Sequence, residues 1–156
     1  MEKFEINWVL VNEIAISPAP SRNENFELIK KNKISSILCL CNENEYSTKY
    51  YEEQTKLILV KRPLPDHRQS NLPEFHQFEE ILIDIENLIK NGPLLIHCLY
   101  GIERSPLICL LWLVKSRKLN FQEAFDYLMS VHKKTNPLTS QIKHAKKFLK
   151  YKKIAY

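Results

Sequence analysis

Glycine and long apolar runs are both scarce in this sequence of 156 residues. Only two glycines occur, Gly92 and Gly101, so each is expected to serve a sharp turn or a close backbone contact. The longest apolar run, residues 107–114, is too short to cross a bilayer. The start, MEKFEINWVL, lacks the basic-then-apolar pattern of a secretion signal. These absences predict a cytoplasmic protein with no stable membrane association.

Patterns typical of metal sites and disulfide frameworks are also missing. The cysteines show no C-x-x-C spacing, and none lies at zinc-ligand spacing from a histidine, apart from the contiguous His97-Cys98 pair. We therefore expect no metal and no cofactor. The net charge of +5 suits an anionic partner, but it is too small to indicate nucleic-acid binding.

What the sequence does contain is an alternation of short apolar strands and amphipathic helices. Strands are predicted at residues 6–16 (one or two strands), 34–41, 57–60 and 94–97. Helices are predicted at residues 26–33, 75–89, 105–116, 120–132 and 140–153. The 57–60 strand is expected to be buried, and Asn71 with Glu74 is expected to form a capping box. The pattern predicts a single α/β domain, residues 1–156, with a central, mostly parallel sheet of four to five strands and helices on both faces.

The segment HCLYGIERSP, residues 97–106, carries the chemistry. It follows a predicted strand and opens a predicted helix, which is where ligands bind in sheets of this kind. The loop amides can form an anion-binding nest, with Gly101 at the sharp turn. Arg104 can grip two phosphate oxygens, and amides, helix dipole and arginine together favour a Cys98 thiolate. The segment therefore predicts a nucleophilic cysteine beneath a phosphate-binding loop.

The same segment resembles the His-Cys-x5-Arg-Ser phosphate loop of cysteine-dependent protein phosphatases, specifically the small dual-specificity group. The stretch AISPAPSRNENFELIKKNKISSILCL is similar to that family's entry strand, first helix and buried strand. The resemblance covers nearly the whole chain and implies a cysteine-phosphatase fold. It also implies metal-independent hydrolysis of phosphotyrosine in proteins through a phosphocysteine intermediate, with phosphoserine and phosphothreonine left open as substrates.

The resemblance further implies a role for each residue of the site. Cys98 is the nucleophile, and Asp66, in the proline-flanked segment PLPDHRQSN, is the general acid and then the general base. His97 hydrogen-bonds the loop and supports the thiolate. Ser105 either caps the following helix or assists breakdown of the phosphoenzyme, and both roles can hold together. The phosphate is bound by Leu99, Tyr100, Gly101, Ile102, Glu103 and Arg104.

Two features bear on the substrate. Glu103 stands where the family usually has a small residue or serine, and we expect its side chain to point away from the phosphate and brace a neighbouring loop. Phosphoinositide phosphatases of this superfamily tend to carry lysines in the loop, and residues 99–103 contain none. This difference favours a phosphorylated protein, or another singly phosphorylated small phosphomonoester, as the partner.

Cys41 is a candidate redox partner of Cys98. It ends the predicted 34–41 strand, and if that strand lies beside residues 94–97, its thiol could trap oxidised Cys98 as a disulfide. An ordinary buried thiol is the alternative. Two other functions also stay open: a rhodanese-like cysteine enzyme, which presents a similar short loop, and a catalytically silent phosphate-binding module.

Overall fold

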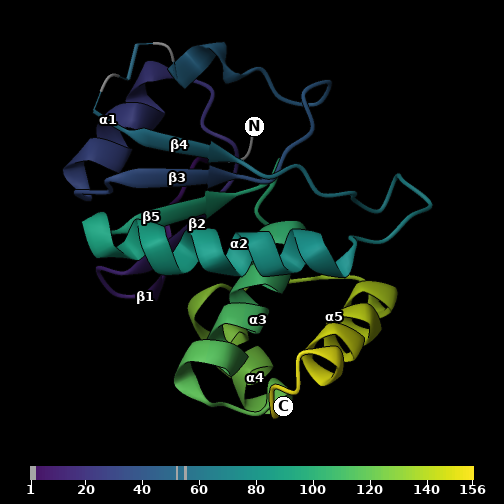
Figure 1. Ribbon diagram of the computed structural model, residues 1–156. Helices are drawn as coiled ribbons and strands as arrows, with labels where there is room; N and C mark the ends of the chain where they lie inside the picture. Colours follow the sequence, from purple (N-terminus) through teal and green to yellow (C-terminus); the bar gives the residue numbers. More distant parts are fainter. Residues whose placement is uncertain (1–2, 52, 55) are drawn as a thin grey trace.

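The computed structural model describes residues 3–51, 53–54 and 56–156. Its centre is a five-stranded sheet with the strand order β1-β2-β5-β3-β4 (Figure 1). The pair β1–β2 is antiparallel, and the other three pairings are parallel. The strands are β1 (Asn7–Leu10), β2 (Ile14–Ser17), β3 (Ser36–Cys39), β4 (Ile58–Lys61) and β5 (Leu94–His97). The predicted fold class, a mostly parallel sheet in an α/β domain, is confirmed.

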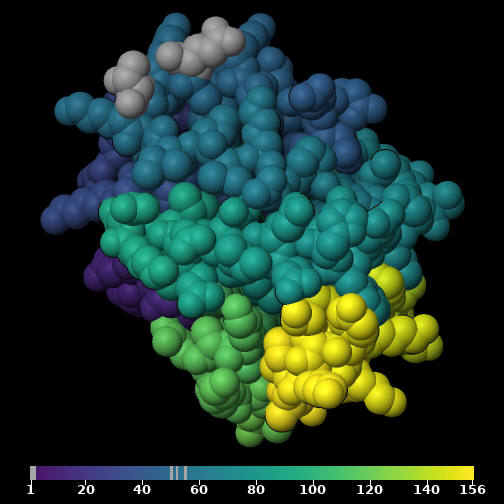
Figure 2. All heavy atoms as spheres, in the orientation of Figure 1, coloured from purple at the N-terminus to yellow at the C-terminus, as the bar shows by residue number. Residues whose placement is uncertain are grey.

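Helices cover both faces of this sheet. On one face α1 packs Phe26 and Ile29 against the sheet, and on the other face the remaining helices supply the larger core. Figure 2 shows α5 against α2, where Phe148 meets the rings of Phe75 and Phe78. The helices are α1 (Asn23–Lys31), α2 (Phe75–Leu88), α3 (Arg104–Arg117), α4 (Phe121–Val131) and α5 (Thr139–Tyr151), with short 3-10 helices η1 (Thr48–Tyr51) and η2 (Ile89–Asn91).

The central strand β5 and most of the helix α3 that follows it are deeply buried. Residues 94–97 of β5 are each 0% exposed, because β2 and β3 flank the strand and helices cover both faces. In α3 every residue from Arg104 to Val114 is buried. The loop between β5 and α3 therefore lies at the centre of the sheet's carboxyl edge, held at both ends by the core. No helix of the described residues is long and apolar enough to span a bilayer.

Two details of the sequence prediction are wrong. The 57–60 segment does form a strand, β4, shifted by one residue to Ile58–Lys61, but among the described residues it is an edge strand beside β3, and its Ile58 is 45% exposed. Helix α2 is capped by Glu74 with Gln77, not by Asn71 with Glu74, and the Gln77 side chain accepts a hydrogen bond from the Glu74 amide. The carbonyl of Pro73, just before the cap, accepts a hydrogen bond from His144 of α5.

Candidate active site

In the loop between β5 and α3, residues 98–103, four carbonyl groups accept hydrogen bonds from residues outside the loop. Because a trans peptide points its C=O and the next N–H in opposite directions, such ties turn the amides of residues 99, 100, 102 and 103 toward the inside of the loop. Inward amides form a cup that suits an anion. Four carbonyls of the loop accept these hydrogen bonds. The Cys98 carbonyl accepts from His97 Nδ1 (3.1 Å), and the Leu99 carbonyl accepts from the Ala19 amide (3.0 Å). The Gly101 carbonyl accepts from His132 Nε2 (2.6 Å), and the Ile102 carbonyl accepts from the Asn136 amide (2.8 Å).

Gly101 meets both of the conditions expected of a glycine here. Its φ of 69° lies in the left-handed region, and a Cβ atom on it would lie 2.9 Å from the carbonyl oxygen of Ser17. Any side chain at this position would push the loop away from β2. The tight fit of the loop against β2 therefore depends on this glycine.

Three of the five predicted catalytic residues line a single pocket of about 270 Å³: Cys98, Arg104 and Asp66. Cys98 follows β5 directly and is 2% exposed, Arg104 opens α3, and Asp66 comes from the loop after β4. That loop (residues 62–74) extends beyond the carboxyl ends of the parallel strands in Figure 1. Residues remote in sequence are thus brought together at the sheet edge, as expected for this class of fold.

The guanidinium of Arg104 is held from behind by a residue that sequence reasoning missed. Glu45 accepts hydrogen bonds from Nη1 (2.9 Å) and Nη2 (2.6 Å) of Arg104, and Nη1 also donates to the carbonyls of Leu40 and Leu64. Burial acts to raise the pKa of Glu45, but the bonds from Arg104 and Asn42 together with the Arg104 charge outweigh it, so the net pKa is lowered. The buried Nε–H of Arg104 has no partner among the described residues and stays available to an anion.

Asp66 is held by the residue two positions after it. Its carboxylate accepts hydrogen bonds from the Arg68 amide (2.9 Å), Nε (2.8 Å) and Nη2 (2.5 Å), and Oδ2 lies 3.7 Å from Nη2 of Arg104. Burial acts to raise the pKa of Asp66, but the bonds from Arg68 and the charges of both arginines outweigh it, so the net pKa is lowered. The carboxylate form is therefore favoured in this arrangement.

Glu103 connects the cup to two neighbouring segments. Its Oε2 lies 2.7 Å from Nδ1 of His67, next to Asp66, and its Oε1 accepts a hydrogen bond from Gln141 of α5 (2.5 Å). These contacts agree with the expectation that Glu103 braces a neighbouring loop. They join the loop of residues 98–103 to the loop that carries Asp66.

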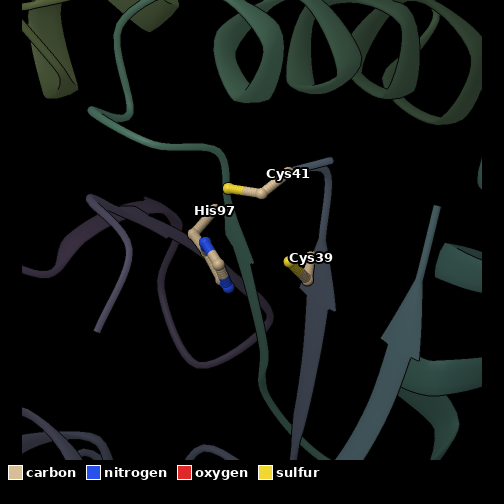
Figure 3. A group of neighbouring side chains, drawn as sticks. All are labelled: Cys39, Cys41 and His97. Atoms are coloured by element: carbon tan, nitrogen blue, oxygen red, sulfur yellow. The ribbon is translucent and has the colours of Figure 1, made fainter. Parts of the chain in front are cut away.

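Behind the cup, on the α1 side of the sheet, His97 lies in a buried cluster with Tyr51, Cys39 and Cys41. His97 donates from Nδ1 to the Cys98 carbonyl and accepts at Nε2 from the Tyr51 hydroxyl (2.6 Å). Figure 3 shows both thiols pointing from the β3 side toward β5. The pKa of Cys39 is lowered, chiefly because the Cys41 thiol donates a hydrogen bond to it, and the pKa of Cys41 is correspondingly raised.

This cluster bears on the expected absence of a metal and on the predicted Cys41–Cys98 disulfide. The two thiols and a His97 nitrogen lie within 4.8 Å of one another, a donor set that soft metal ions accept. Both His97 nitrogens, however, are already hydrogen-bonded. Cys41 packs with Cys39 on the α1 side of the sheet, whereas Cys98 packs with the core on the opposite face. All four thiols are free, and the Cys41–Cys98 disulfide stays a prediction.

Ser105 is the second residue of α3, and Glu103 occupies the position before the helix. The prediction that Ser105 caps this helix is therefore wrong. Its hydroxyl is buried and has no partner among the described residues. That leaves the hydroxyl able to interact with a group bound at the loop.

Comparisons with known proteins agree on one family. The family model "Dual specificity phosphatase, catalytic domain" matches residues 19–153. Human dual specificity protein phosphatase 9 is 30% identical over 112 residues, which are 72% of this chain and 28% of that protein. The MAP kinase phosphatase with leucine-rich repeats protein 2 of Dictyostelium discoideum is 27% identical over 126 residues, 81% of this chain and 17% of that protein. The chain thus spans less than a third of either relative.

Among solved structures, Tk-PTP in its active form has a TM-score of 0.80 at 24% identity, covering 93% of this chain and 96% of its own. The human tyrosine phosphatase-like serine/threonine/tyrosine-interacting protein has a TM-score of 0.82 at 16% identity, and the match covers 94% of this chain and 97% of that protein's chain. At these identities the likeness concerns the fold.

Proposed function

Because the chain belongs to the dual-specificity phosphatase family, a family of metal-independent hydrolases, we propose that it hydrolyses phosphomonoesters through a phosphocysteine intermediate on Cys98. The observation that carries the proposal is the meeting of Cys98, Arg104 and Asp66 in one pocket. Family membership sets aside the rhodanese-like alternative. A catalytically silent phosphate-binding module is the alternative that an assay must decide.

In the first step the substrate phosphate occupies the cup, and the Cys98 sulfur attacks phosphorus. An S–P bond forms as the bond from phosphorus to the leaving oxygen breaks, and Asp66 gives that oxygen a proton. The inward amides and the free Nε–H of Arg104 stabilise the charge on the transferring group. Glu45 fixes the other two guanidinium nitrogens, so Arg104 is already oriented before substrate arrives.

Asp66 must hold a proton to act in this step, although Arg68 and Arg104 favour its charged form. A bound phosphate ester brings negative charge into the same pocket, which offsets the two arginines and raises the pKa of the carboxyl. In the second step the Asp66 carboxylate takes a proton from water, the oxygen attacks phosphorus, and the S–P bond breaks. The buried Ser105 hydroxyl is free to donate to the departing Cys98 sulfur.

We propose a positioning role for His97. It donates from Nδ1 to the carbonyl of Cys98, and this tie is one of those that turn the loop amides inward. With that nitrogen donating, Nε2 accepts from the Tyr51 hydroxyl, which fixes the ring orientation. The absence of lysine from residues 99–103 supports a phosphorylated protein as substrate over a polyphosphorylated lipid.

The proposal is tested by hydrolysis of p-nitrophenyl phosphate in the presence of a chelator. Wild type should turn over, and Cys98→Ser should not, while still binding a phosphate analogue such as tungstate. Activity that persists in Cys98→Ser would contradict the covalent mechanism. Tungstate binding by an inactive wild type would favour the silent module instead.

A further inference from the structure

A second cavity opens beside the catalytic pocket and is the larger of the two. It measures about 660 Å³, against about 270 Å³ for the catalytic pocket. The two cavities share Leu99, Tyr100 and Ile102 as a common wall. Tyr100 is 59% exposed, so this wall rises between them as an aromatic ridge. We call the larger one the flanking cavity.

A second wall of the flanking cavity comes from the segment between β2 and α1, residues 18–22, and several hydrogen bonds fix this segment. The Ala19 amide donates to the carbonyl of Leu99, and the Pro20 carbonyl accepts from the buried Tyr46 hydroxyl. The amides of Ser21 and Arg22 both donate to the Asn25 side chain at the start of α1. Because these bonds hold the segment in place, a ligand meets a preformed surface and loses little freedom in ordering it.

The lining of the flanking cavity combines apolar and basic groups. Phe4, Pro18 and Ala19 add to the apolar side chains of the shared wall, and Lys3 and Arg22 bring positive charge. The described lining residues include no aspartate or glutamate. Such a cavity suits a bulky apolar side chain that has a negative group beside it.

Resting on the function proposed above, we propose that the flanking cavity is a substrate subsite for the residues adjoining the phosphorylated residue. It selects a protein segment that carries a bulky apolar residue and an acidic residue close in sequence to the phosphate-bearing one, because the two cavities share a wall. A free small phosphomonoester occupies the catalytic pocket alone and gains nothing from the flanking cavity. The preferred substrate is therefore a phosphoprotein.

The test compares two phosphotyrosyl peptides of equal length with p-nitrophenyl phosphate. One peptide carries Leu and Glu on both sides of the phosphotyrosine, and the other carries Ala and Gln in their place. Wild type should show a kcat/KM roughly tenfold higher for the first peptide, which corresponds to about 1.4 kcal/mol. Arg22→Glu and Phe4→Ala should each remove most of that preference and leave p-nitrophenyl phosphate hydrolysis within about twofold of wild type.

The matched control is Lys147→Glu, the same type of charge reversal on the exposed side of α5. It should leave the peptide preference intact. Because Phe4→Ala also removes packing, thermal unfolding is followed for each variant, and Phe4→Leu should retain the preference. Equal kcat/KM for the two peptides in wild type would overturn the subsite while leaving the proposed function standing. The subsite would also be overturned if Arg22→Glu lowered kcat/KM only for phosphoinositide vesicles, since the occupant would then be a lipid headgroup.

Discussion

The two sides of the phosphate loop are built from different interactions. On the front, toward solvent, the Asp66 carboxylate bonds to Arg68, and Glu103 bonds to His67. At the rear, His97 is 0% exposed and bonds to Tyr51 beside two buried thiols. The front contacts determine where the Asp66 carboxyl lies and how readily it ionises, whereas the rear cluster orients the backbone of the loop.

The difference predicts how each side responds to substitution. Arg68 and His67 are more than half exposed, so their loss should alter rate and pH dependence with little effect on stability. The bonds of His97 are buried, and leaving one such partner unsatisfied costs about 1–3 kcal/mol. Substitutions of His97 or Tyr51 should therefore change both the free energy of unfolding and the geometry of the 98–103 loop.

Apart from the loss of the Cys98 thiol, the largest effect is expected at Arg104, which lies in the pocket with Asp66 and bonds to Glu45. Arg104→Ala should reduce kcat for p-nitrophenyl phosphate by about 10³–10⁵-fold, since the charge on the transferring group loses its main cationic partner. Arg104→Lys should fail nearly as badly, because lysine cannot bond both oxygens of Glu45 and still reach the phosphate. Steady-state kinetics on both variants tests this, and near-wild-type turnover in Arg104→Lys would contradict it.

Asp66→Asn should lower kcat by about 10²–10⁴-fold on an alkyl phosphate, whose leaving oxygen needs a proton. The loss should be smaller on p-nitrophenyl phosphate, whose leaving group departs as an anion. The measurement is kcat for wild type and variant across a series of leaving groups. An unchanged kcat on the alkyl phosphate would move the acid elsewhere, and His67 would be tested next.

Glu103→Gln and His67→Ala should each lower kcat roughly tenfold on the alkyl phosphate by loosening the tie between the two loops. Because these residues act through Asp66, neither change should reduce kcat further in an Asp66→Asn background. A double-mutant cycle measures this coupling. Additive losses would mean that Glu103 and His67 do not act by positioning Asp66.

Arg68→Ala should change the pH profile more than the maximum rate. Arg68 holds the pKa of Asp66 down, so removing it raises that pKa. A general acid works only while protonated, and kcat falls as pH rises through its pKa, so the decline should move to higher pH in the variant. Profiles of kcat against pH for both proteins test the sign, and a decline at lower pH would contradict it.

The smallest effect, invisible without an oxidant, is expected from the rear thiols. After peroxide treatment and thiol rescue, Cys41→Ser should recover less activity than wild type, and peptide mapping should find a Cys41–Cys98 bridge in wild type only. A bridge needs Cα atoms about 4.4–6.8 Å apart and Cys41 released from Cys39. Cys39→Ser is the matched control and should retain the bridge. A mapped bridge to any other cysteine would contradict the pairing.

Much of the fold and the centre of the site could be predicted because the signals are local. Residues 97–105 form a contiguous motif, and the alternation of apolar strands with amphipathic helices fixed the fold class. The apolar run at 57–60 could not reveal an edge strand, because a run of apolar residues carries no information on how many neighbours a strand has.

The supporting residues were missed for a related reason. Glu45 lies in a polar stretch with no motif, and its single clue is that it comes four residues after Cys41, near the carboxyl edge of the sheet. Tyr51 and His132 reach the loop only through tertiary contacts, to His97 and to the Gly101 carbonyl. No spacing rule connects such distant positions.

The contact between Gly101 and Ser17 has a consequence for exchanging parts between homologues. The loop touches the end of β2 so closely that neither segment can shift without the other. A chimera that imports the 98–104 loop from a relative should therefore import residues 17–22 as well. The transferable unit of this chain is a pair of segments far apart in the sequence, and libraries that shuffle only the motif would break the fit between them.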